Sequence, residues 1–283
     1  MMLLTDVKVI TSYDYSAPIT EAGDITKYYL AIRSWIKSLP NWKHRPLDVP
    51  VDKPKANFGT VTLDRIGSMS DFNKENCVID DKPMTFEKLN HPFGFVSYET
   101  DSDFCGVLNL TNFSDIAYII VNGKFEGTLY NKFNQYHNQT INITNCDPRG
   151  NHILIVIENT GRIGYETVNA YKGLLGKVVL DRKLLLGWRS CGIDLPHRID
   201  ADFFGQKDPT STVGVYSGEL VINAAGEIHD TWIHMNNWGK GVMNLYIPSG
   251  FLQRGKNDII VIELEGVRNK TVEFIDHPIW KLN

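Results

Sequence analysis

The sequence predicts a mostly β protein, with two jelly-roll-like or galactose-binding-like β-sandwiches after one strand–helix unit. From Phe58 onward, short apolar, β-branched or aromatic runs are divided by Gly, Pro, Asn and Asp, as in "FGFVSYET" and "FCGVLNLTNF". Regularly spaced runs of this length are typical of all-β sandwiches. In "VNGKFEG", Asn122 and Gly123 tolerate the positive φ of a type I′ turn, which indicates a two-residue hairpin.

An internal repeat indicates that there are two sandwiches of related design. "GNHILIVIEN" (Gly150–Asn159) matches "GKNDIIVIEL" (Gly255–Leu264), with Gly and Asn before a buried strand that ends in Val-Ile-Glu. The boundary is expected within Asp194–Thr212, which is rich in Pro, Gly and Asp. We therefore expect the first sandwich over residues 57–195 and the second over 196–283.

The N-terminal 40 residues have a different pattern, with one strand and one helix. Asp6–Tyr15 alternates as a strand does. Asp24 is the expected N-cap of a helix that ends at Pro40, with apolar residues at helical spacing. These residues are Ile25, Tyr29, Ile32, Ile36 and Leu39. Residues 41–56 contain three prolines and no periodicity, which predicts a linker.

Composition excludes several classes of partner. The chain has 283 residues and a net charge of −4, with no run of Lys or Arg, so a nucleic-acid partner is not expected. No apolar run approaches the roughly 18 residues that a spanning helix needs, so no membrane partner is expected. The opening "MMLLTDVKVI" is too short and too quickly charged to be a signal peptide.

The cysteines and the glycosylation sequons indicate in which cellular compartment the protein folds. The four cysteines, at 77, 105, 146 and 191, form no C-x-x-C pair, which disfavours a zinc site and leaves two disulfides, one or none. Five asparagines begin N-x-[ST] sequons and are candidate glycosylation sites: Asn109, Asn112, Asn138, Asn142 and Asn269. Five sequons in one chain indicate a lineage that passes through the secretory pathway.

No motif in the sequence identifies catalytic chemistry. Phosphate-loop, dinucleotide-binding, zinc-protease and nucleophile-elbow patterns are all missing, so no cofactor and no metal site is expected. Trp232, Trp238 and Tyr246 would suit either stacking on a sugar or packing in a sandwich core, and core packing is favoured. "KGLLGK" (Lys172–Lys177) indicates a turn between strands.

Several stretches resemble the β-galactosidases of glycoside hydrolase family thirty-five, the lysosomal β-galactosidase group of animals. The similar stretches are collinear with the family and span nearly the whole chain. They include "TSYDYSAPITEAGDITKYYLAIR", "ENTGRIGYETVNAYKGLLGKVVL", "GWRSCGIDL", "DTWIHMNNWGKGV" and "LYIPSGFLQRGKNDIIVIELEG".

The resemblance implies that Asp6–Tyr15 and Ile25–Leu39 are the eighth strand and eighth helix of a TIM barrel. Such barrels carry their sites at the C-terminal ends of their strands, and Tyr15 matches a family position that lines the galactose pocket. The two catalytic glutamates of the family match no residue here, so no catalytic residue is assigned. The resemblance also implies a strand missing after Val242, which would shorten the second sandwich. A lysosomal or secreted location is implied as well.

The expected function is therefore that of a C-terminal β-domain fragment of a β-galactosidase. The parent reaction is hydrolysis of terminal β-linked galactose, and the chain alone is expected to be inactive. Its expected partners are β-galactosides in the parent enzyme, a catalytic barrel, or a second copy bound through the exposed helix. The alternative is a non-catalytic β-sandwich protein that binds glycans or a barrel. A truncated gene model and a genuine isoform fit the sequence equally.

Overall fold

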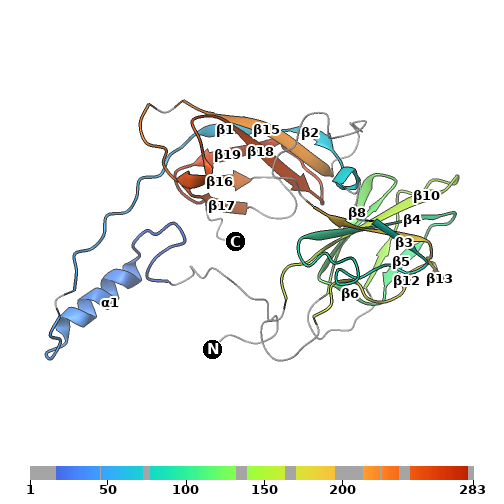
Figure 1. Ribbon diagram of the computed structural model, residues 1–283, viewed down its shortest axis with the longest axis horizontal. Coiled ribbons are helices and arrows are strands. Elements are labelled where there is room, and N and C mark those ends of the chain that lie inside the picture. Colours follow the sequence, from blue (N-terminus) through green and yellow to red (C-terminus); the bar gives the residue numbers. More distant parts are fainter. Residues whose placement is uncertain are drawn as a thin grey trace.

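The computed structural model describes residues 17–44, 46–72, 77–131, 139–162, 170–194, 213–223, 225–235 and 243–279. The described chain is mostly β, as expected: two bodies of strands lie beside each other, and one helix stands away from both (Figure 1). Within these residues, no helix is both long enough and apolar enough to cross a bilayer.

The first sandwich packs a six-stranded sheet against a four-stranded one. The six-stranded sheet has the order β3 (Cys77–Asp80), β14 (Trp188–Ile193), β4 (Phe95–Ser102), β10 (Asn151–Glu158), β7 (Ile116–Val121), β8 (Lys124–Tyr130). The four-stranded sheet has the order β13 (Lys183–Leu184), β12 (Val178–Leu180), β5 (Val107–Leu110), β9 (Gln139–Asn142). A small third sheet pairs β11 (Gly173–Leu174) with β6 (Phe113–Ser114). Fully buried side chains such as Trp188, Tyr98 and Ile155 fill the core between the sheets.

The Asn-Gly hairpin is confirmed. β7 and β8 pair antiparallel on either side of Asn122 and Gly123, whose φ angles are 51° and 74°. Both residues therefore have the left-handed backbone that a type I′ turn requires.

The second sandwich draws its strands from both ends of the chain. One sheet has the order β1 (Gly59–Thr62), β19 (Thr271–Ile275), β16 (Thr231–Met235), β17 (Met243–Ile247). The other has the order β18 (Gly255–Glu263), β15 (Gly214–Ile222), β2 (Asp64–Gly67). Short 3₁₀ turns lie at Met69–Phe72 and Ser249–Phe251.

This arrangement differs from the expected division at residue 57. β1 and β2 precede the first sandwich in sequence, yet β1 pairs with β19 and β2 pairs with β15. Leu63 between them is fully buried in the second core, and Arg65 Nε donates to Val213 O across 148 residues. The first sandwich is thus inserted between β2 and β15, and the second uses residues on both sides of it.

A third apolar cluster joins the two sandwiches. Leu154 and Val156, on the outer face of the six-stranded sheet, pack with Val215 and Leu264 of the second sandwich. Thr128 Oγ1 also donates to Glu265 Oε1 at 2.6 Å across this junction. The two sandwiches therefore share buried surface as well as a chain connection.

The helix α1 (Lys27–Ser38) confirms the predicted helix but begins at a different cap. Thr26 is the N-cap, and its hydroxyl accepts a hydrogen bond from Tyr28 N. The Asp24 carboxylate instead binds Lys55 Nζ at 2.7 Å. Asp24 was expected to be the N-cap. Its carboxylate is instead paired with Lys55, and the hydroxyl of Thr26 caps the helix.

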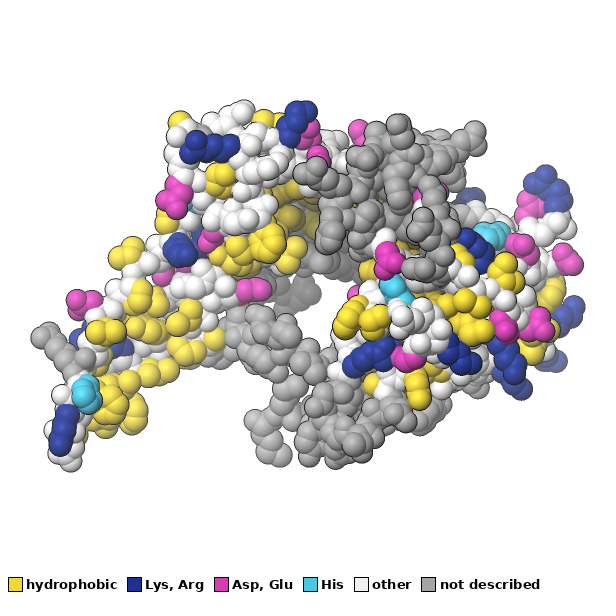
Figure 2. Space-filling view, viewed as in Figure 1, with side chains coloured by type: hydrophobic (Ala, Val, Ile, Leu, Met, Phe, Trp, Pro, Cys, Tyr) yellow, Lys and Arg dark blue, Asp and Glu magenta, His cyan; other side chains and the backbone are white. Residues whose placement is uncertain are grey.

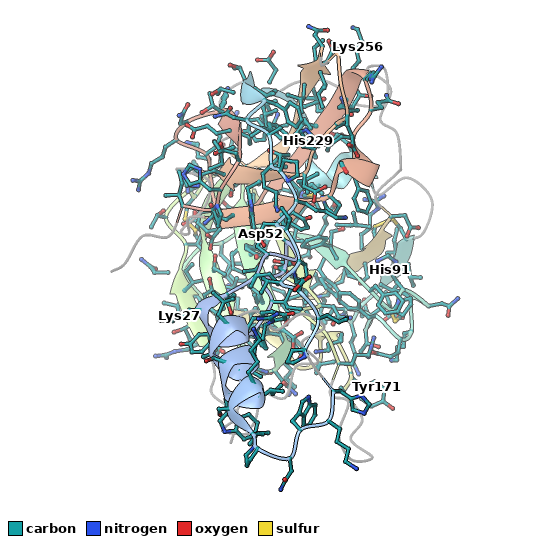
Figure 3. All side chains as sticks on the ribbon, turned by 90° about the vertical axis from the view of Figure 1, so that its left-hand side faces the viewer. Lys27, Asp52, His91, Tyr171, His229 and Lys256 are labelled. Atoms are coloured by element: carbon teal, nitrogen blue, oxygen red, sulfur yellow. A yellow bond between two sulfur atoms is a disulfide. The ribbon has the colours of Figure 1, made fainter. Side chains whose placement is uncertain are left out.

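No side chain of α1 is buried. Residues 41–44 and 46–56 form neither a helix nor a strand, and they run from α1 towards β1 (Figure 1). Figure 3 shows this part facing the viewer, with Lys27 at the start of α1 and Asp52 in the returning segment. Asp52 Oδ1 accepts from Ile25 N at 2.8 Å, so the segment contacts the base of the helix. The strand predicted over Asp6–Tyr15 lies outside the described residues.

We expect slower amide hydrogen exchange in β10 than in β18, although the two strands share the repeated motif. β10 lies between β4 and β7 and buries six of its eight residues, whereas β18 is an edge strand with two of nine buried. Interior strands open only with the core around them, so they exchange more slowly. Exchange measured by mass spectrometry on the intact chain tests this, and stronger protection of Asp258–Glu263 than of Ile153–Glu158 would contradict it.

Candidate functional site

The residue predicted to line a galactose pocket, Tyr15, lies outside the described residues. The aromatic cluster is only partly described. Trp232 is 5% exposed and packs on Tyr246, with ring centroids 5.2 Å apart, while Trp238 lies outside the described part. Core packing is thus the better interpretation of Trp232. Across the described residues, no group of three or more His, Cys, Asp or Glu side chains is placed to hold a metal ion.

Trp232 and Tyr246 help to anchor the N-terminal segment. Ala22 is buried against Trp232, and the backbone of Lys55 forms a parallel bridge with that of Asp230. Tyr246 Oη donates to Asp230 Oδ2 at 2.5 Å. Burial and the Asp230 carboxylate raise the pKa of Tyr246, so its hydroxyl stays protonated as the donor. This network connects the segment that carries α1 to the second sandwich.

The main buried polar cluster of the first sandwich centres on Lys172 and Asp115. Lys172 Nζ lies 2.7 Å from both Asp115 oxygens, and both residues are buried. Ser114 Oγ donates to Asp115 Oδ1, and Thr160 donates to Oδ2 through its backbone N and its hydroxyl. Burial tends to raise the pKa of Asp115, but the bonds from Lys172 and Ser114 outweigh it and hold that pKa below its ordinary value.

A second ion pair, between Arg162 and Glu87, lies beside this cluster. Arg162 Nη1 donates to Glu87 Oε1 at 2.6 Å and to Ala170 O at 2.7 Å. Glu87 also accepts from the backbone N of Lys172 at 3.2 Å. Burial tends to raise the pKa of Glu87, and the bonds from Arg162 and Lys172 lower it overall. Arg162 thus connects Glu87 to Ala170, and all three residues lie in the first sandwich.

The residue after Lys172 has to be glycine. Gly173 has a φ of 106°, and a Cβ there would lie 2.2 Å from the Tyr98 hydroxyl oxygen. Tyr98 is fully buried and donates to Met84 O at 2.8 Å. The close approach of strand β11 to Tyr98 brings Lys172 to Asp115. The stretch "KGLLGK", predicted to be a turn between strands, thus contains a buried cation that its pattern did not indicate.

The contacts of this cluster are structural ones, made between groups of the protein itself. Both oxygens of Asp115 accept hydrogen bonds from protein donors, and the ammonium group of Lys172 is paired with that carboxylate. A general acid, base or nucleophile needs an atom free to reach a substrate. Sequence reasoning did not select Glu87, Asp115, Arg162 or Lys172. Two of these residues, Arg162 and Lys172, lie in the stretch Glu158–Leu180, which carries part of the family resemblance and could have drawn attention to them.

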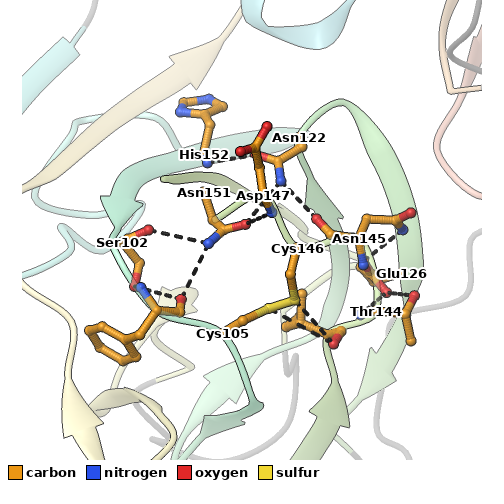
Figure 4. Close-up of a disulfide and its surroundings, with 12 residues drawn as sticks. Ser102, Cys105, Asn122, Glu126, Thr144, Asn145, Cys146, Asp147, Asn151 and His152 are labelled. Atoms are coloured by element: carbon orange, nitrogen blue, oxygen red, sulfur yellow. Dashed lines mark hydrogen bonds between the residues drawn. A yellow bond between two sulfur atoms is a disulfide. The ribbon is translucent and has the colours of Figure 1, made fainter. Parts of the chain in front are cut away.

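All four cysteines form disulfides, Cys77–Cys191 and Cys105–Cys146. Figure 4 shows the second bridge beside Asn151, Asn122 and Glu126. Asn151 Oδ1 accepts from the backbone N of Asp147, four residues earlier, at 2.8 Å. In the repeated motif, Asn257 Oδ1 accepts from Gln253 N, also four residues earlier, at 2.8 Å. Both copies of the motif therefore contain an asparagine that closes the preceding turn, at positions that differ by one residue when the Val-Ile-Glu ends are aligned.

The predicted glycosylation sites differ in exposure. Asn142 and Asn269 are exposed, whereas Asn109 and Asn112 are half-buried. Asn138 lies outside the described residues.

Comparison with known proteins gives one matching family model and many relatives. Residues 83–194 match the model "Beta-galactosidase, first all-beta domain", and this range contains the whole Lys172–Asp115 cluster. "Beta-galactosidase 17" of Arabidopsis thaliana is 27% identical over 95% of this chain and 46% of its own length. The "Beta-galactosidase" of Bos taurus is 29% identical over 96% of this chain and 48% of its own.

The chain thus spans about half the length of the relatives it matches. Among solved structures, a GH2 β-galacturonidase from Eisenbergiella tayi is 14% identical, with a TM-score of 0.32 over 75% of this chain and 37% of that one. This similarity is too weak to indicate a common overall fold.

Proposed function

Residues 83–194 belong to the first all-β domain of β-galactosidases, and on this basis we propose that the chain is the β-sandwich portion of such an enzyme. It works beside a catalytic barrel that hydrolyses terminal β-linked galactose. The observation that carries the proposal is similarity to β-galactosidases along 95% or more of the chain, with about half of each relative covered.

The chain's own role is to form a rigid platform for the barrel. The two sandwiches share the apolar junction of Leu154, Val156, Val215 and Leu264, and the buried Lys172–Asp115 pair and the partly exposed Arg162–Glu87 pair tie segments of the first sandwich together. Tyr15 forms one wall of the galactose pocket, and the two glutamates that carry out hydrolysis come from barrel units that match no part of this sequence.

An apolar groove along α1 supports association with a barrel. The groove has a volume of 340 Å³, and its lining residues come from α1 and the segments on either side of it: Pro18, Ile19, Tyr29, Ile32, Arg33, Ile36, Pro46 and Leu47. Ile32 and Trp35 are 48% and 63% exposed, and Figure 2 shows apolar side chains gathered on this part of the molecule. In a TIM barrel, neighbouring helices would cover such a face. Self-association is the competing way to cover it.

The alternative function, a stand-alone glycan-binding protein, has less support. Trp232 is buried against Tyr246 and Ala22, so this side chain offers no face for a sugar to stack on. Passage through the secretory pathway, to the lysosome or outside the cell, fits both functions. It is supported by five sequons and by two disulfides, which persist in oxidising compartments.

A binding measurement separates the two functions. We expect isothermal titration calorimetry of the purified chain with a β-galactoside to give no heat of binding, because Tyr15 alone is one wall of a pocket. Cellobiose serves as the control sugar. Saturable binding of the galactoside, and not of cellobiose, would favour the glycan-binding protein over the β-galactosidase platform.

A further inference from the structure

Two sequon asparagines that are 33 residues apart in the sequence lie near each other on one sheet face. β5 and β9 pair antiparallel, with Asn109 opposite Thr140 and Val107 opposite Asn142. Leu108 and Leu110 point into the core, so the alternate residues Val107 and Asn109 face outward. Residues on one face at diagonal positions of such a pair are about 7–8 Å apart. Asn109 and Asn142 therefore share the outer face of the four-stranded sheet.

We propose that this outer face is the glycosylated face of the first sandwich, with an N-linked oligosaccharide on Asn142 and none on Asn109. In the transfer, a lipid-linked pyrophosphate oligosaccharide is the donor. A bond forms between Nδ2 of the asparagine and C1 of the sugar, the C1–O bond to pyrophosphate breaks, and the amide gives up one proton.

The two asparagines differ in the space around their amides. Asn142 is exposed and stands at the end of β9, an edge strand of its sheet. Asn109 is half-buried on β5, between β12 and β9, and its Oδ1 is fully enclosed without a hydrogen-bond partner among the described residues. A sugar on Asn109 would have to fit beside the side chains of both neighbouring strands, β12 and β9, on this half-buried position. A sugar on Asn142 projects into solvent.

A glycan on Asn142 also has a physical use at this place. Val107 lies directly opposite Asn142 and is 47% exposed. An exposed apolar side chain beside the edge strand of the described sheet favours edge-to-edge association. A bulky hydrophilic glycan at the end of β9 would cover Val107. The two disulfides are an independent support, because disulfides persist in oxidising compartments and this modification takes place there.

Site mapping on the wild-type chain tests the inference. The chain is directed into the secretory pathway of cultured cells by a heterologous signal peptide, and the secreted protein is deglycosylated with peptide N-glycosidase F in heavy-oxygen water. This enzyme converts each glycosylated asparagine to labelled aspartate, which tandem mass spectrometry locates. We expect the label at 142 and not at 109. Label at 109, or its absence from 142, would overturn the proposal.

Two matched variants give a second measurement. Asn142→Gln should lose one glycan on a gel, whereas Asn109→Gln should keep the wild-type pattern. Substituting Thr144 is a poor choice, because its hydroxyl donates to Glu126 Oε2 at 2.8 Å and holds the loop of the Cys105–Cys146 bridge. Mapping on the wild type decides the matter even where a variant is not secreted. Neither measurement depends on galactoside binding, so the outcome is independent of the proposed function.

Discussion

Replacing Lys172 with methionine should destabilise the chain by about 3–5 kcal/mol, the cost of breaking a buried ion pair. Lys172 and Asp115 are 4% and 9% exposed, and the ammonium lies 2.7 Å from both carboxylate oxygens. Methionine keeps most of the side-chain volume but leaves the Asp115 charge buried with only the Ser114 and Thr160 donors. Chemical denaturation followed by tryptophan fluorescence measures the change, because Trp188 is in the same core.

Lys256 provides a matched control. Its Nζ lies 2.8 Å from Glu219, but the two side chains are 75% and 39% exposed, and Figure 3 shows Lys256 at the periphery of the molecule. Lys256→Met should cost at most about 1 kcal/mol, because water screens an exposed pair. The double variant Asp115→Asn/Lys172→Met should be more stable than Lys172→Met, because it removes the stranded charge. Equal effects of Lys172→Met and Lys256→Met would show that burial of the pair is unimportant.

The cost of Lys172→Met should also depend on pH. In the wild type the pKa of Asp115 is lower in the folded state than in the unfolded state. Asp115 therefore contributes to the free energy of unfolding at pH values above its unfolded-state pKa. That contribution is lost as the pH falls through its folded-state pKa. Without Lys172, the largest cause that lowers the folded-state pKa of Asp115 is lost, so the variant loses the stability that this lowered pKa provides above the unfolded value. The difference between wild type and variant should therefore be larger at about pH 7 than at about pH 4.

Removing the Cys77–Cys191 bridge should have the second large effect. Loop-closure entropy gives about 5 kcal/mol for this bridge and about 4 kcal/mol for Cys105–Cys146, because the cysteines are 114 and 41 residues apart. Cys77–Cys191 also fastens the edge strand β3 to β14, its single partner in the described sheet.

The paired alanine variants of each bridge, unfolded in denaturant without reductant, measure these two contributions. The Cys77→Ala/Cys191→Ala variant should be the less stable of the two. A larger loss from Cys105→Ala/Cys146→Ala would mean that local strain or packing outweighs loop length.

Features fixed by neighbouring residues were predictable from the sequence. The Asn122–Gly123 turn and the helix α1 each depend on a few adjacent residues, and both are confirmed. The repeated strand motif is also matched by structure, since Asn151 and Asn257 make the same four-residue contact. The cap of α1 was misplaced by two residues because Asp24 binds Lys55, which is far away in the sequence.

Features that depend on distant partners were not predictable. The β1 and β2 patterns show that they are strands but not which strands they pair with, so residues 57–72 were assigned to the wrong sandwich. Lys172 was missed for the same reason. Lysines are mostly exposed, and the burial of Lys172 depends on Asp115, which is 57 residues away, between β6 and β7.

The most direct test of the central claim is a hydrolysis assay on the purified chain. The claim is that these residues form a β-galactosidase platform whose catalytic glutamates lie elsewhere. A chromogenic β-galactoside at acidic pH should give no turnover above the buffer rate, because retaining hydrolysis needs two positioned carboxyl groups. Activity that follows the chain through successive purification steps, and that persists in a Tyr15→Phe variant, would contradict the claim and would require a catalytic pair within this sequence.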